Sequence, residues 1–508
     1  MTATTRWAEA EPVAIVGAGL AGLTAAAWLR RRGVPVVVYE AGPQIAGLAT
    51  SHTDDEGFTT DFGAHFITNR LAAALGVSAL CRTVHRYDEA VLLDGKVYSY
   101  PCGLARNPQF VLSAIRARIA SLTAGTGGRG SPHDRALSTP ASAADVFRTR
   151  YGPALAERVA IPLLEAWSGE PASALAAAVA TKFRSGIGHT ILLAAAGRLT
   201  HRAVAIGYGN ECAETPHVWH VYPVGGVSVL CEALYASVRD AVQLESPVQE
   251  IEVENGRVVA VRVRGRARPV SAVVSTAPVH ILAKLVTGTD ALAPFARFRY
   301  RPMLFVNLRF EGRGLLPATM LWTPRSPDAT EDRAFFRLTE TPLSVPWLAP
   351  EGKTVITADI GCAVGDARWT MPDAALGELC LAHLDCIPDA RSRYLGCTVV
   401  RTPVAYPVFL NEYEDDRKRL AGGTRVAGLY SIGRNGEFAH LLMEDVYWST
   451  LRRMRRLMAE TIPRRAEVEA KPATVRPAIR AAGSRLSTSG VHRVLGGSVP
   501  LGPSTYIR

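Results

Sequence analysis

The chain has 508 residues, of which 48% are hydrophobic and 20% are charged, so it can build two or three ordinary soluble domains. No stretch reaches the roughly 18 consecutive apolar residues that a membrane span needs, and Met1–Glu11 lacks the apolar core of a signal peptide. We therefore expect a cytoplasmic protein with no transmembrane segment. The eight cysteines are scattered without a C-x-x-C, which favours reduced thiols over disulfides or zinc, and no metal is expected.

The net charge of +11 is concentrated near the C-terminus. From Thr461 onward the chain holds eight Lys/Arg and two Asp/Glu, a net of +6, which leaves 49 basic and 44 acidic residues, a net of +5, before it. The segment 461–508 is also rich in Pro, Gly and Ser, which predicts a basic, disordered tail. Because most such tails are simply solvated, we expect no nucleic-acid partner.

The first elements form a βαβ pattern. The apolar run Pro12–Val16 predicts a buried parallel strand, and Gly17–Gly22 (GAGLAG) then fits G-x-G-x-x-G. A helix is predicted over Leu23–Arg32 and a second strand over Val34–Tyr39, which ends on Glu40. The strand, glycines, helix, strand and acid occur in register, which favours a dinucleotide-binding unit over a glycine-rich turn without a ligand.

Each residue type in this unit has a mechanical reason. Gly17 allows the tight turn, Gly19 lets the backbone approach a pyrophosphate, and Gly22 lets the helix pack close to the strand. The helix N-terminus offers N–H groups to that pyrophosphate. Glu40, eighteen residues after Gly22, is placed to accept hydrogen bonds from the adenosine ribose. Its charge would repel a 2′-phosphate, which argues against NADP.

The segment after Glu40 favours FAD over NAD. Flavoproteins with two dinucleotide-binding motifs have a second glycine-rich turn close to the flavin, and we interpret Gly47-Leu48 as that turn. The alternative is an ordinary loop glycine. Asp61–Phe66, with the sequence DFGAHF, follows it.

Later stretches have the patterns of regular structure. Val248–Val263 alternates apolar and polar residues around Asn255-Gly256, which predicts a β-hairpin. Val270–Ser275 predicts a buried strand that returns to the cofactor sheet, and Val426–Ile432 predicts another strand. A long helix is predicted over Leu442–Glu460.

Taken in order, these motifs resemble the flavin amine oxidase superfamily, in the branch that holds protoporphyrinogen oxidase-like proteins and UDP-galactopyranose mutase. The resemblance runs from about Val13 to Leu457 and depends on the ordered set, since no single motif is decisive. Besides the elements above, the matching segments are Leu93–Pro101, Tyr151-Gly152, Glu165–Gly169, Tyr222–Gly226, Ser275–Pro278, Gly433–Gly436 and Met443–Asp445.

The resemblance implies an α/β fold, with a Rossmann-type FAD-binding domain of the two-dinucleotide-binding kind and an interleaved α+β substrate domain. The FAD-binding domain is expected to be discontinuous, with the substrate domain built from the segments between its pieces. The pieces are 1–105, 215–280 and 395–460 for the FAD-binding domain, and 106–214 and 281–394 for the substrate domain. The Gly/Ser-rich stretch Thr123–Ser142 has the composition of a mobile loop.

By the resemblance, the FAD contacts come from both ends of the chain. The backbone of Val248 faces the adenine, Arg434 lies on the pyrophosphate side, and the helix that begins near Met443 directs its N–H groups at the flavin C2 carbonyl. A surface arginine that closes a turn is the alternative for Arg434. The full set of expected FAD contacts is Gly17, Ala18, Gly19, Leu20, Ala21, Gly22, Glu40, Ala41, Gly47, Leu48, Gly63, Ala64, His65, Val248, Gly433, Arg434 and Met443.

The implied function is an FAD-dependent oxidoreductase, of the amine oxidase or protoporphyrinogen oxidase type, that removes a hydride from a small organic substrate. The expected partners are that substrate and an electron acceptor such as O2, with a homodimer as one possible state. Amine oxidases proper commonly keep a lysine beside flavin N5, on a strand that corresponds to Arg301–Phe310. Its equivalent here is Met303 or Leu304, which argues against an ordinary amine oxidase.

Two alternatives remain open. The first is a flavin-dependent sugar-nucleotide mutase resembling UDP-galactopyranose mutase, to whose pattern His65, Thr68-Asn69 and Arg434 are similar. The second is a flavoprotein-like scaffold without activity.

His65, Tyr406 and Arg301 are the candidate catalytic residues. His65 would lie against the flavin or hold the backbone in a turn, and Tyr406 would face the substrate or fill the core. Arg301, with Arg337, would bind an anionic substrate group or belong to a solvated strand face. His440 stands where relatives often have tyrosine. No Ser–His–Asp order, metal-ligand spacing or P-loop indicates another chemistry.

Overall fold

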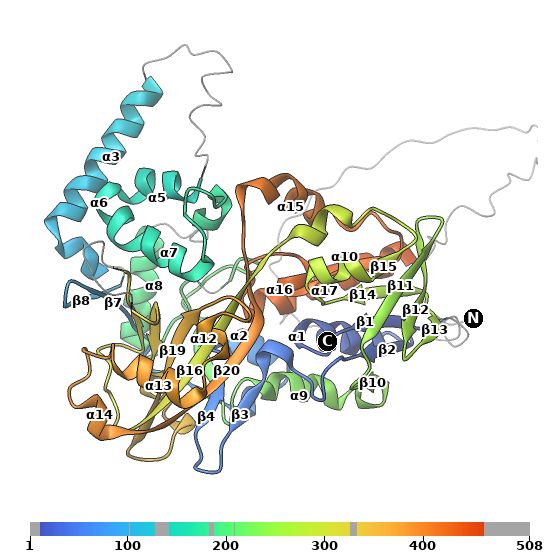
Figure 1. Ribbon diagram of the computed structural model, residues 1–508, viewed down its shortest axis with the longest axis horizontal. Helices are drawn as coiled ribbons and strands as arrows, with labels where there is room; N and C mark the ends of the chain where they lie inside the picture. Colours follow the sequence, from blue (N-terminus) through green and yellow to red (C-terminus); the bar gives the residue numbers. More distant parts are fainter. Residues whose placement is uncertain are drawn as a thin grey trace, which may run out of the picture. The chain divides into compact units, whose positions relative to one another are not determined.

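The computed structural model describes residues 11–63, 65–100, 102–126, 142–181, 187–207, 209–325 and 333–461 (Figure 1). Ala64, one of the expected FAD contacts, lies outside the described residues, as does the basic tail beyond residue 461. Of the expected mobile loop, residues 123–126 belong to helix α3 (Pro108–Thr126), and Ser142 caps helix α5 (Ala143–Tyr151). The rest of that loop is outside the described residues. Within the described ranges, no helix combines the length and apolarity needed to cross a membrane.

A parallel five-stranded sheet is built from segments far apart in the sequence. Its strand order is β10-β2-β1-β14-β21, and each neighbouring pair is parallel. The strands are β10 (Val242–Gln243), β2 (Val36–Tyr39), β1 (Val13–Val16), β14 (Ala272–Ser275) and β21 (Leu429–Ser431). β1 and β14 are buried along their whole length, because both faces of the sheet are covered.

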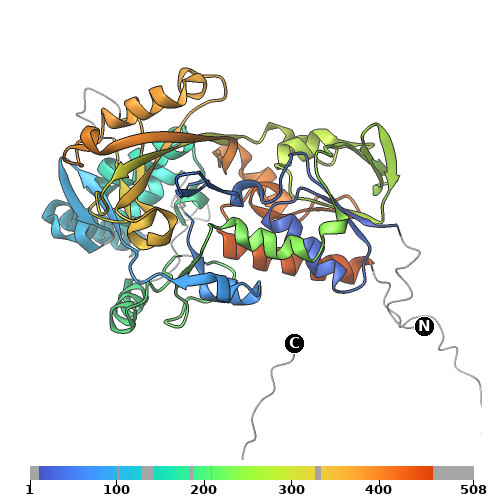
Figure 2. The same cartoon turned by 90° about the horizontal axis from the view of Figure 1, so that it is seen from below.

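Helices α1, α9 and α17 cover one face of this sheet (Figure 2). They span Leu20–Arg30, Ser228–Ala236 and Met443–Thr461, and α1 contacts both of the others. Val13 and Ile15 of β1 share one hydrophobic core with Leu23, Leu230 and Met454 of these helices. α17 confirms the helix that was predicted over Leu442–Glu460.

The other face packs against a four-stranded sheet with the order β13-β12-β11-β15. Its strands are β13 (Arg266–Pro269), β12 (Arg257–Val263), β11 (Val248–Glu254) and β15 (Val286–Thr287), and helix α10 (Val279–Leu285) lies beside it. Ala14 and Val273 share a core with Ile251 and Val261. The predicted hairpin is confirmed, since β11 and β12 pair antiparallel across Asn255-Gly256, where both residues have positive φ.

A seven-stranded sheet forms the second main layer (Figure 1), with the order β20-β16-β19-β18-β17-β7-β8. Its strands are β20 (Tyr394–Pro407), β16 (Tyr300–Glu311), β19 (Lys353–Gly361), β18 (Arg337–Thr339), β17 (Met320–Trp322), β7 (Glu89–Leu93) and β8 (Lys96–Ser99). Leu304 and Leu308 pack with Leu376 of helix α13 (Asp373–Leu381) on one face. Met303 and Phe305 point to the opposite face, because successive side chains of a strand alternate.

The remaining elements connect these layers. α3 and α5 form a helical group with α6 (Pro153–Leu155), the π-helical turn η5 (Ala156–Ala160) and α7 (Ile161–Ser168). Small sheets comprise β3 (Ser51–Thr53) with β4 (Thr59–Asp61), and β5 (Ile67–Thr68) with β9 (His220–Pro223) and β6 (Cys81–Thr83). The other helices are α2 (Asn69–Ala74), α8 (Ile187–Thr200), α11 (Thr341–Ser344), α12 (Ala367–Thr370), α14 (Ala390–Arg393), α15 (Glu414–Ala421) and α16 (Gly433–Gly436). Short helical turns are η2 (Gly47–Ala49), η3 (Ser78–Leu80), η4 (Cys102–Arg106), η6 (Ala177–Thr181), η7 (Arg239–Ala241), η8 (Ala293–Arg297), η9 (Pro346–Leu348) and η10 (Asn411–Tyr413).

Several element boundaries differ from the prediction. α1 begins at Leu20 and not at Leu23, because Gly19 already acts as its N-cap. β21 covers only Leu429–Ser431 of the predicted Val426–Ile432, since Gly428 has a positive φ of 77° that interrupts extended backbone.

The strands also sort differently from the predicted domain boundaries. β7 and β8 fall inside the predicted FAD-binding piece 1–105, yet they belong to the seven-stranded sheet. β20 spans the predicted boundary at 395 and belongs to the same sheet. These strands therefore pair with the seven-stranded sheet and not with the five-stranded sheet. No motif in the sequence indicates this pairing. The division into two domains stays a prediction.

Candidate functional site

The glycine turn between β1 and α1 has the geometry expected of a nucleotide site. Gly17 has a φ of 98°, and its N–H donates to the carbonyl of Tyr39 at 2.8 Å, which joins β1 to the end of β2. A Cβ atom at Gly22 would lie 1.9 Å from the Gly17 carbonyl oxygen, so only glycine fits. The helix N-cap is Gly19, with no side-chain hydrogen bond. The N–H groups of the first turn are therefore not capped by a side chain and can bind an anion.

Glu40 lies at the end of β2, beside this turn. Its carboxylate accepts hydrogen bonds from the N–H of Ala18 at 2.7 Å and the N–H of Gly42 at 2.8 Å. Each carboxylate oxygen has a second lone pair with which to accept a ribose hydroxyl. The N–H of Ser246 donates to the Glu40 carbonyl at 2.8 Å, which brings the start of β11 at Val248 to the same end of the sheet. The next expected contact, Ala41, is exposed.

The second glycine turn lies directly against the first. Ala46 forms a bridge with Gly19, and its N–H donates to the Ala18 carbonyl at 2.9 Å. A Cβ atom at Gly47 would lie 3.7 Å from the Gly19 Cα atom, and Gly47 has a φ of 54°. Leu48 follows within η2. Two turns from different parts of the chain thus share one surface.

The Gly433-Arg434 segment completes this surface from the C-terminal side. Gly433 has a φ of 78°, and a Cβ atom there would lie 3.0 Å from the Cβ of Ala21 in the first turn of α1. The Arg434 guanidinium lies 4.6 Å from the centroid of the Tyr406 ring. Arg434 Nε is buried without a hydrogen-bond partner among the described residues, and burial lowers the pKa of this side chain. The alternative of a surface arginine closing a turn is therefore wrong.

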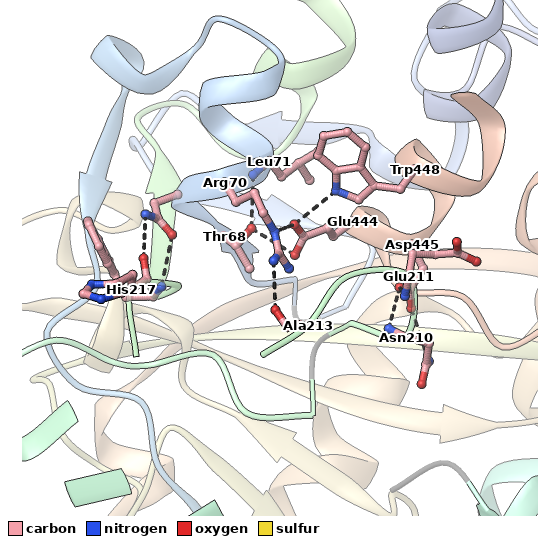
Figure 3. A network of polar contacts seen from close by, with 12 residues as sticks. Thr68, Arg70, Leu71, Asn210, Glu211, Ala213, His217, Glu444, Asp445 and Trp448 are labelled. Atoms are coloured by element: carbon pink, nitrogen blue, oxygen red, sulfur yellow. Dashed lines mark hydrogen bonds and ion pairs between the residues drawn. The ribbon is translucent and has the colours of Figure 1, made fainter. Parts of the chain in front are cut away.

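The start of α17 is held by a buried polar network (Figure 3). Glu444 accepts hydrogen bonds from Arg70 Nε at 2.6 Å and from Thr68 Oγ1 at 3.0 Å. Asp445 accepts one from the backbone N–H of Asn210 at 2.7 Å, and burial raises the pKa of its carboxyl group. Both acids lie in the first turn, where they complement the helix dipole. The network ties α2 and the loop at Asn210 to the helix end at which Met443 was predicted to meet the flavin.

Gly63 and His65 lie where the glycine turns approach the seven-stranded sheet. A Cβ atom at Gly63 would lie 2.9 Å from Cε1 of Phe305, so the backbone touches the ring. His65 Nε2 lies 2.8 Å from the Phe62 carbonyl oxygen, as expected for a histidine that holds a turn. Burial lowers the pKa of His65, and Arg434 and Arg337 lower it further. The imidazole is therefore neutral near pH 7.

The seven-stranded sheet contributes a buried ion pair to this place. Arg337 on β18 and Asp359 on β19 stand opposite each other in the strand register and form a salt bridge, with side chains 12% and 0% exposed. The guanidinium also lies 5.3 Å from the Trp322 ring centroid. Arg337 Nε and Asp359 Oδ1 are both buried without a partner in the described part of the chain. The solvated strand face considered for Arg337 is therefore wrong.

Tyr406 belongs to an aromatic wall beside these arginines. Its ring centroid lies 5.0 Å from that of Trp167 and 6.1 Å from that of His440. With Arg434 over its face, Tyr406 connects the C-terminal cofactor segment to β20. Its hydroxyl also raises the pKa of Arg434, against the effect of burial.

Arg301 stands opposite Tyr406 in the register of β16 and β20. Its side chain lies between two glycines: a Cβ atom at Gly169 would lie 2.6 Å from its Cζ, and one at Gly361 would lie 2.5 Å from Nη2. Burial lowers the pKa of Arg301. The structure thus brings His65, Tyr406, Arg434 and Arg337 together, and Arg301 is paired with Tyr406 on the neighbouring strand.

Two residues of this place, Asp359 and Phe305, are not among those predicted from the sequence. Asp359 is the one charged residue in the buried run TVITADI, and a buried carboxylate in such a run needs a partner. That signal could have paired it with an arginine on a neighbouring strand. β16 carries no lysine, and of the two residues predicted to replace it, Met303 faces the site whereas Leu304 faces α13.

Comparisons with known structures identify the fold. The chain is similar in structure to a reduced UDP-galactopyranose mutase, with a TM-score of 0.68, 16% identity, and coverage of 88% of this chain and 94% of that one. It is similar to a protein assigned as a protoporphyrinogen oxidase from Exiguobacterium sp. 255-15, with a TM-score of 0.64, 18% identity, and coverage of 89% and 99%. It is also similar to cyclohexylamine oxidase from Brevibacterium oxydans, with a TM-score of 0.62, 17% identity, and coverage of 89% of this chain and 100% of that one. At these identities the likeness shows the fold, and the predicted fold class is confirmed.

The family follows from the sequence itself. The model of the flavin containing amine oxidoreductases matches residues 20–447, well over half of the chain. The chain therefore belongs to the flavin containing amine oxidoreductase family, and it is an FAD-dependent oxidoreductase. The predicted resemblance, enzyme class and cofactor are confirmed at this level.

The residues present fit FAD. The first turn of α1 has no side-chain cap, Gly22 has no room for a Cβ atom, and Arg434 has a buried Nε without a partner in the described ranges. These features suit a dinucleotide whose central pyrophosphate meets the first turn of α1 and Arg434. When bound, FAD supplies the capacity to accept two electrons from the substrate.

Proposed function

We propose that this enzyme removes a hydride from a small organic substrate and passes the electrons to O2 or another acceptor. The observation that carries the proposal is the half-buried group of His65, Arg337, Tyr406 and Arg434. It lies where the glycine turns of the five-stranded sheet approach the seven-stranded sheet. Polar groups that converge in such a place, next to a predicted cofactor surface, are typical of an active site.

The substrate that this group would bind carries an anionic or strongly polar acceptor. Arg337 keeps a buried Nε–H without a partner in the described residues, in addition to its bond to Asp359. A buried donor left unsatisfied is costly, and a carboxylate, carbonyl or phosphate oxygen would satisfy it. We assign Arg434 to FAD and Arg337 with Tyr406 to the substrate.

His65 is proposed to hold a proton-accepting nitrogen at the site. Its Nε2 donates to the Phe62 carbonyl, so the neutral ring has an unprotonated Nδ1. Since burial lowers the pKa of His65, Nδ1 is available as an acceptor near neutral pH. Tyr406 orients the substrate through its hydroxyl and ring, and Arg301 supports Tyr406 from the neighbouring strand.

A second candidate function is a sugar-nucleotide mutase that uses reduced flavin without net oxidation. The two adjacent buried arginines favour it, because a diphosphate would engage both guanidinium groups. The missing lysine on β16 is compatible with either reaction.

The test is an anaerobic titration of the FAD-loaded enzyme. Oxidised enzyme is mixed with amines, reduced ring systems and anionic substrates, and separately with UDP-galactose after reduction by dithionite. An oxidoreductase loses its oxidised flavin absorbance on mixing with its substrate, and admitting air then shows whether O2 is the acceptor. A mutase converts the UDP-sugar only when pre-reduced and leaves the flavin reduced. If no compound bleaches the oxidised flavin and the reduced enzyme alone converts UDP-galactose, the proposed removal of a hydride from a small substrate is wrong.

Substrate assignment has its own control. With an anionic substrate in hand, Arg337→Gln is expected to raise KM at least tenfold, about 1.4 kcal/mol, and to leave the KM of an uncharged analogue nearly unchanged. Equal effects on both analogues would assign Arg337 to structure and not to substrate binding.

A further inference from the structure

Helix α3 presents an apolar stripe to solvent. Val111, Leu112, Ile115 and Ile119 are exposed by 36%, 52%, 49% and 56%. Their spacing of i, i+1, i+4 and i+8 places them on one side of the helix, which we call the outer face of α3. The opposite side carries the buried Phe110, and the helix packs on that side against α5 and α6 (Figure 1). An amphipathic helix with its apolar side outward indicates an interaction surface.

Basic side chains border the outer face of α3. Arg116 and Arg118 are exposed, and at 100° per residue they fall on either side of the apolar stripe. From Lys96 to Thr126 the chain holds four basic residues and no acidic one. Positive charge beside an apolar helix face is typical of helices that lie in the interface of an anionic membrane.

A hollow lies near the N-terminal end of α3. An open cavity of about 400 Å³ is lined by Lys96, Val97, Tyr98, Ser99, Gly103 and Arg106. It lies between β8 and η4, and η4 contacts both β8 and α3. Lys96 and Arg106 can donate to a phosphate, and the hydroxyl groups of the lining can donate as well. Val97 is 46% exposed, so the rim of the hollow is also partly apolar.

We propose that the outer face of α3 and this hollow bind the surface of a bilayer that contains anionic phospholipids. The apolar stripe enters the boundary between headgroups and acyl chains, and Lys96 and Arg106 bind headgroup phosphates. This surface shares no residue with the proposed active site, so the inference does not depend on the reaction.

Charge selects this occupant. A second copy docked across a twofold axis would set the same basic residues, Arg116 among them, against themselves, with no acid from 96–126 to offset them. The tail is also excluded as an occupant by its sign, with eight Lys/Arg against two Asp/Glu from Thr461 onward. An anionic surface complements the exposed Lys96, Arg106 and Arg116 and covers the apolar stripe at the same time.

The experiment is cosedimentation of the full chain with two kinds of vesicle, one of phosphatidylcholine and one of equal parts phosphatidylcholine and phosphatidylglycerol. Binding is expected to the anionic vesicles and to weaken with added salt. The double variant Leu112→Asp/Ile115→Asp is expected to bind at least tenfold more weakly, and Arg116→Glu about fivefold. Ile281→Asp is the matched control, because Ile281 is 38% exposed on α10 and lies outside this surface.

Four outcomes of the cosedimentation would overturn the proposal. They are no binding to either vesicle, equal binding to both, undiminished binding of the double variant, and an equal loss in Ile281→Asp. Undiminished binding of the double variant would assign the membrane contact to the tail or another surface. A wild-type dimer in sedimentation equilibrium that the double variant abolishes would assign the outer face of α3 to a second copy. Circular dichroism and FAD content verify folding, and Arg116→Glu decides the case if the double variant does not fold.

Discussion

The two sheets that approach each other at the candidate site contribute different chemical groups to it. The five-stranded sheet offers glycines and backbone N–H groups, held by turns such as Gly17–Gly22 and Ala46–Leu48 that touch each other. The seven-stranded sheet offers charged and aromatic side chains from neighbouring strands, with Arg337 and Asp359 paired across β18 and β19. The surface of the first sheet depends on glycines, which have no side chain, and the surface of the second depends on charged and aromatic side chains.

This difference separates two kinds of selectivity. A surface of backbone groups recognises a pyrophosphate through geometry that any member of the family can keep. A surface of side chains on strands can change its substrate by single substitutions without disturbing the sheet. We therefore expect damage to the first region to remove the cofactor, and damage to the second to alter stability and substrate use while FAD stays bound.

The largest effect is expected from Gly22→Val. The added side chain begins 1.9 Å from the Gly17 carbonyl oxygen, where backbone has to move and the first turn of α1 is displaced. The affinity for FAD should fall at least about 100-fold, because the turn holds the pyrophosphate. The measurement is the flavin absorbance of the purified protein and its titration with FAD. Gly209→Ala is the control, since a Cβ atom there meets nothing closer than 3.6 Å. A fully yellow Gly22→Val protein would contradict the packing argument.

Asp359→Leu should next reduce stability without removing FAD. It leaves the Arg337 guanidinium buried beside Trp322 without its carboxylate, which costs about 3 kcal/mol in free energy of unfolding. Urea unfolding measures this cost. Glu378→Gln breaks an exposed pair with Arg391, whose side chains are 55% and 67% exposed, and should cost less than about 0.5 kcal/mol. Equal losses in both variants would show that the buried pair has no special role.

His220 makes stability depend on pH. Burial lowers the pKa of this histidine from 6.5 to about 4, with its ring packed against Phe66 and Tyr87. His220 binds a proton below about pH 6.5 in the unfolded chain but only below about pH 4 in the folded one. The stability that the neutral, buried ring provides is therefore complete above pH 6.5 and is lost as the pH falls to 4. The loss should be about 3 kcal/mol. In His220→Gln the fall in unfolding free energy between pH 7 and 4 should be smaller by that amount, and an unchanged pH profile would contradict the assignment.

Arg70→Met should have the smallest of these effects. It removes the hydrogen bond to Glu444 at the start of α17, and the Arg70 side chain is 26% exposed, so water can partly replace it. We expect a loss of about 2 kcal/mol in unfolding free energy and a weaker hold on the N-terminus of α17. Arg86→Gln is the matched control, because Arg86 and Asp88 are 61% and 36% exposed. FAD affinity that falls as in Gly22→Val would indicate that α17 contributes more to the cofactor surface than the glycine turns do.

The cofactor side could be predicted from the sequence because its signals are local. The motif Gly17–Gly22 and the acid Glu40 lie within one βαβ unit, and the hairpin at Asn255-Gly256 specifies its own turn. Even the approach of Gly433 to Ala21 follows once β21 joins the same sheet.

The substrate side could be predicted only in part because its signals are not local. Arg337 was a candidate, but its burial depends on Asp359, which comes from another strand whose register no motif fixes. The glycines at 169 and 361 make room for Arg301, and nothing near them in the sequence indicates that partner. Likewise β7 and β8 follow the cofactor motifs directly in the chain but pair with β17.

The most direct test of the central claim is an FAD titration of the wild type and of Glu40→Arg, followed by flavin fluorescence. The account predicts one FAD per chain in the wild type and affinity at least about 100-fold weaker in the variant, because the carboxylate that accepts the ribose hydroxyl groups becomes a cation. A Glu40→Arg protein that is purified with its full complement of FAD would contradict the placement of the adenosine at the end of β2.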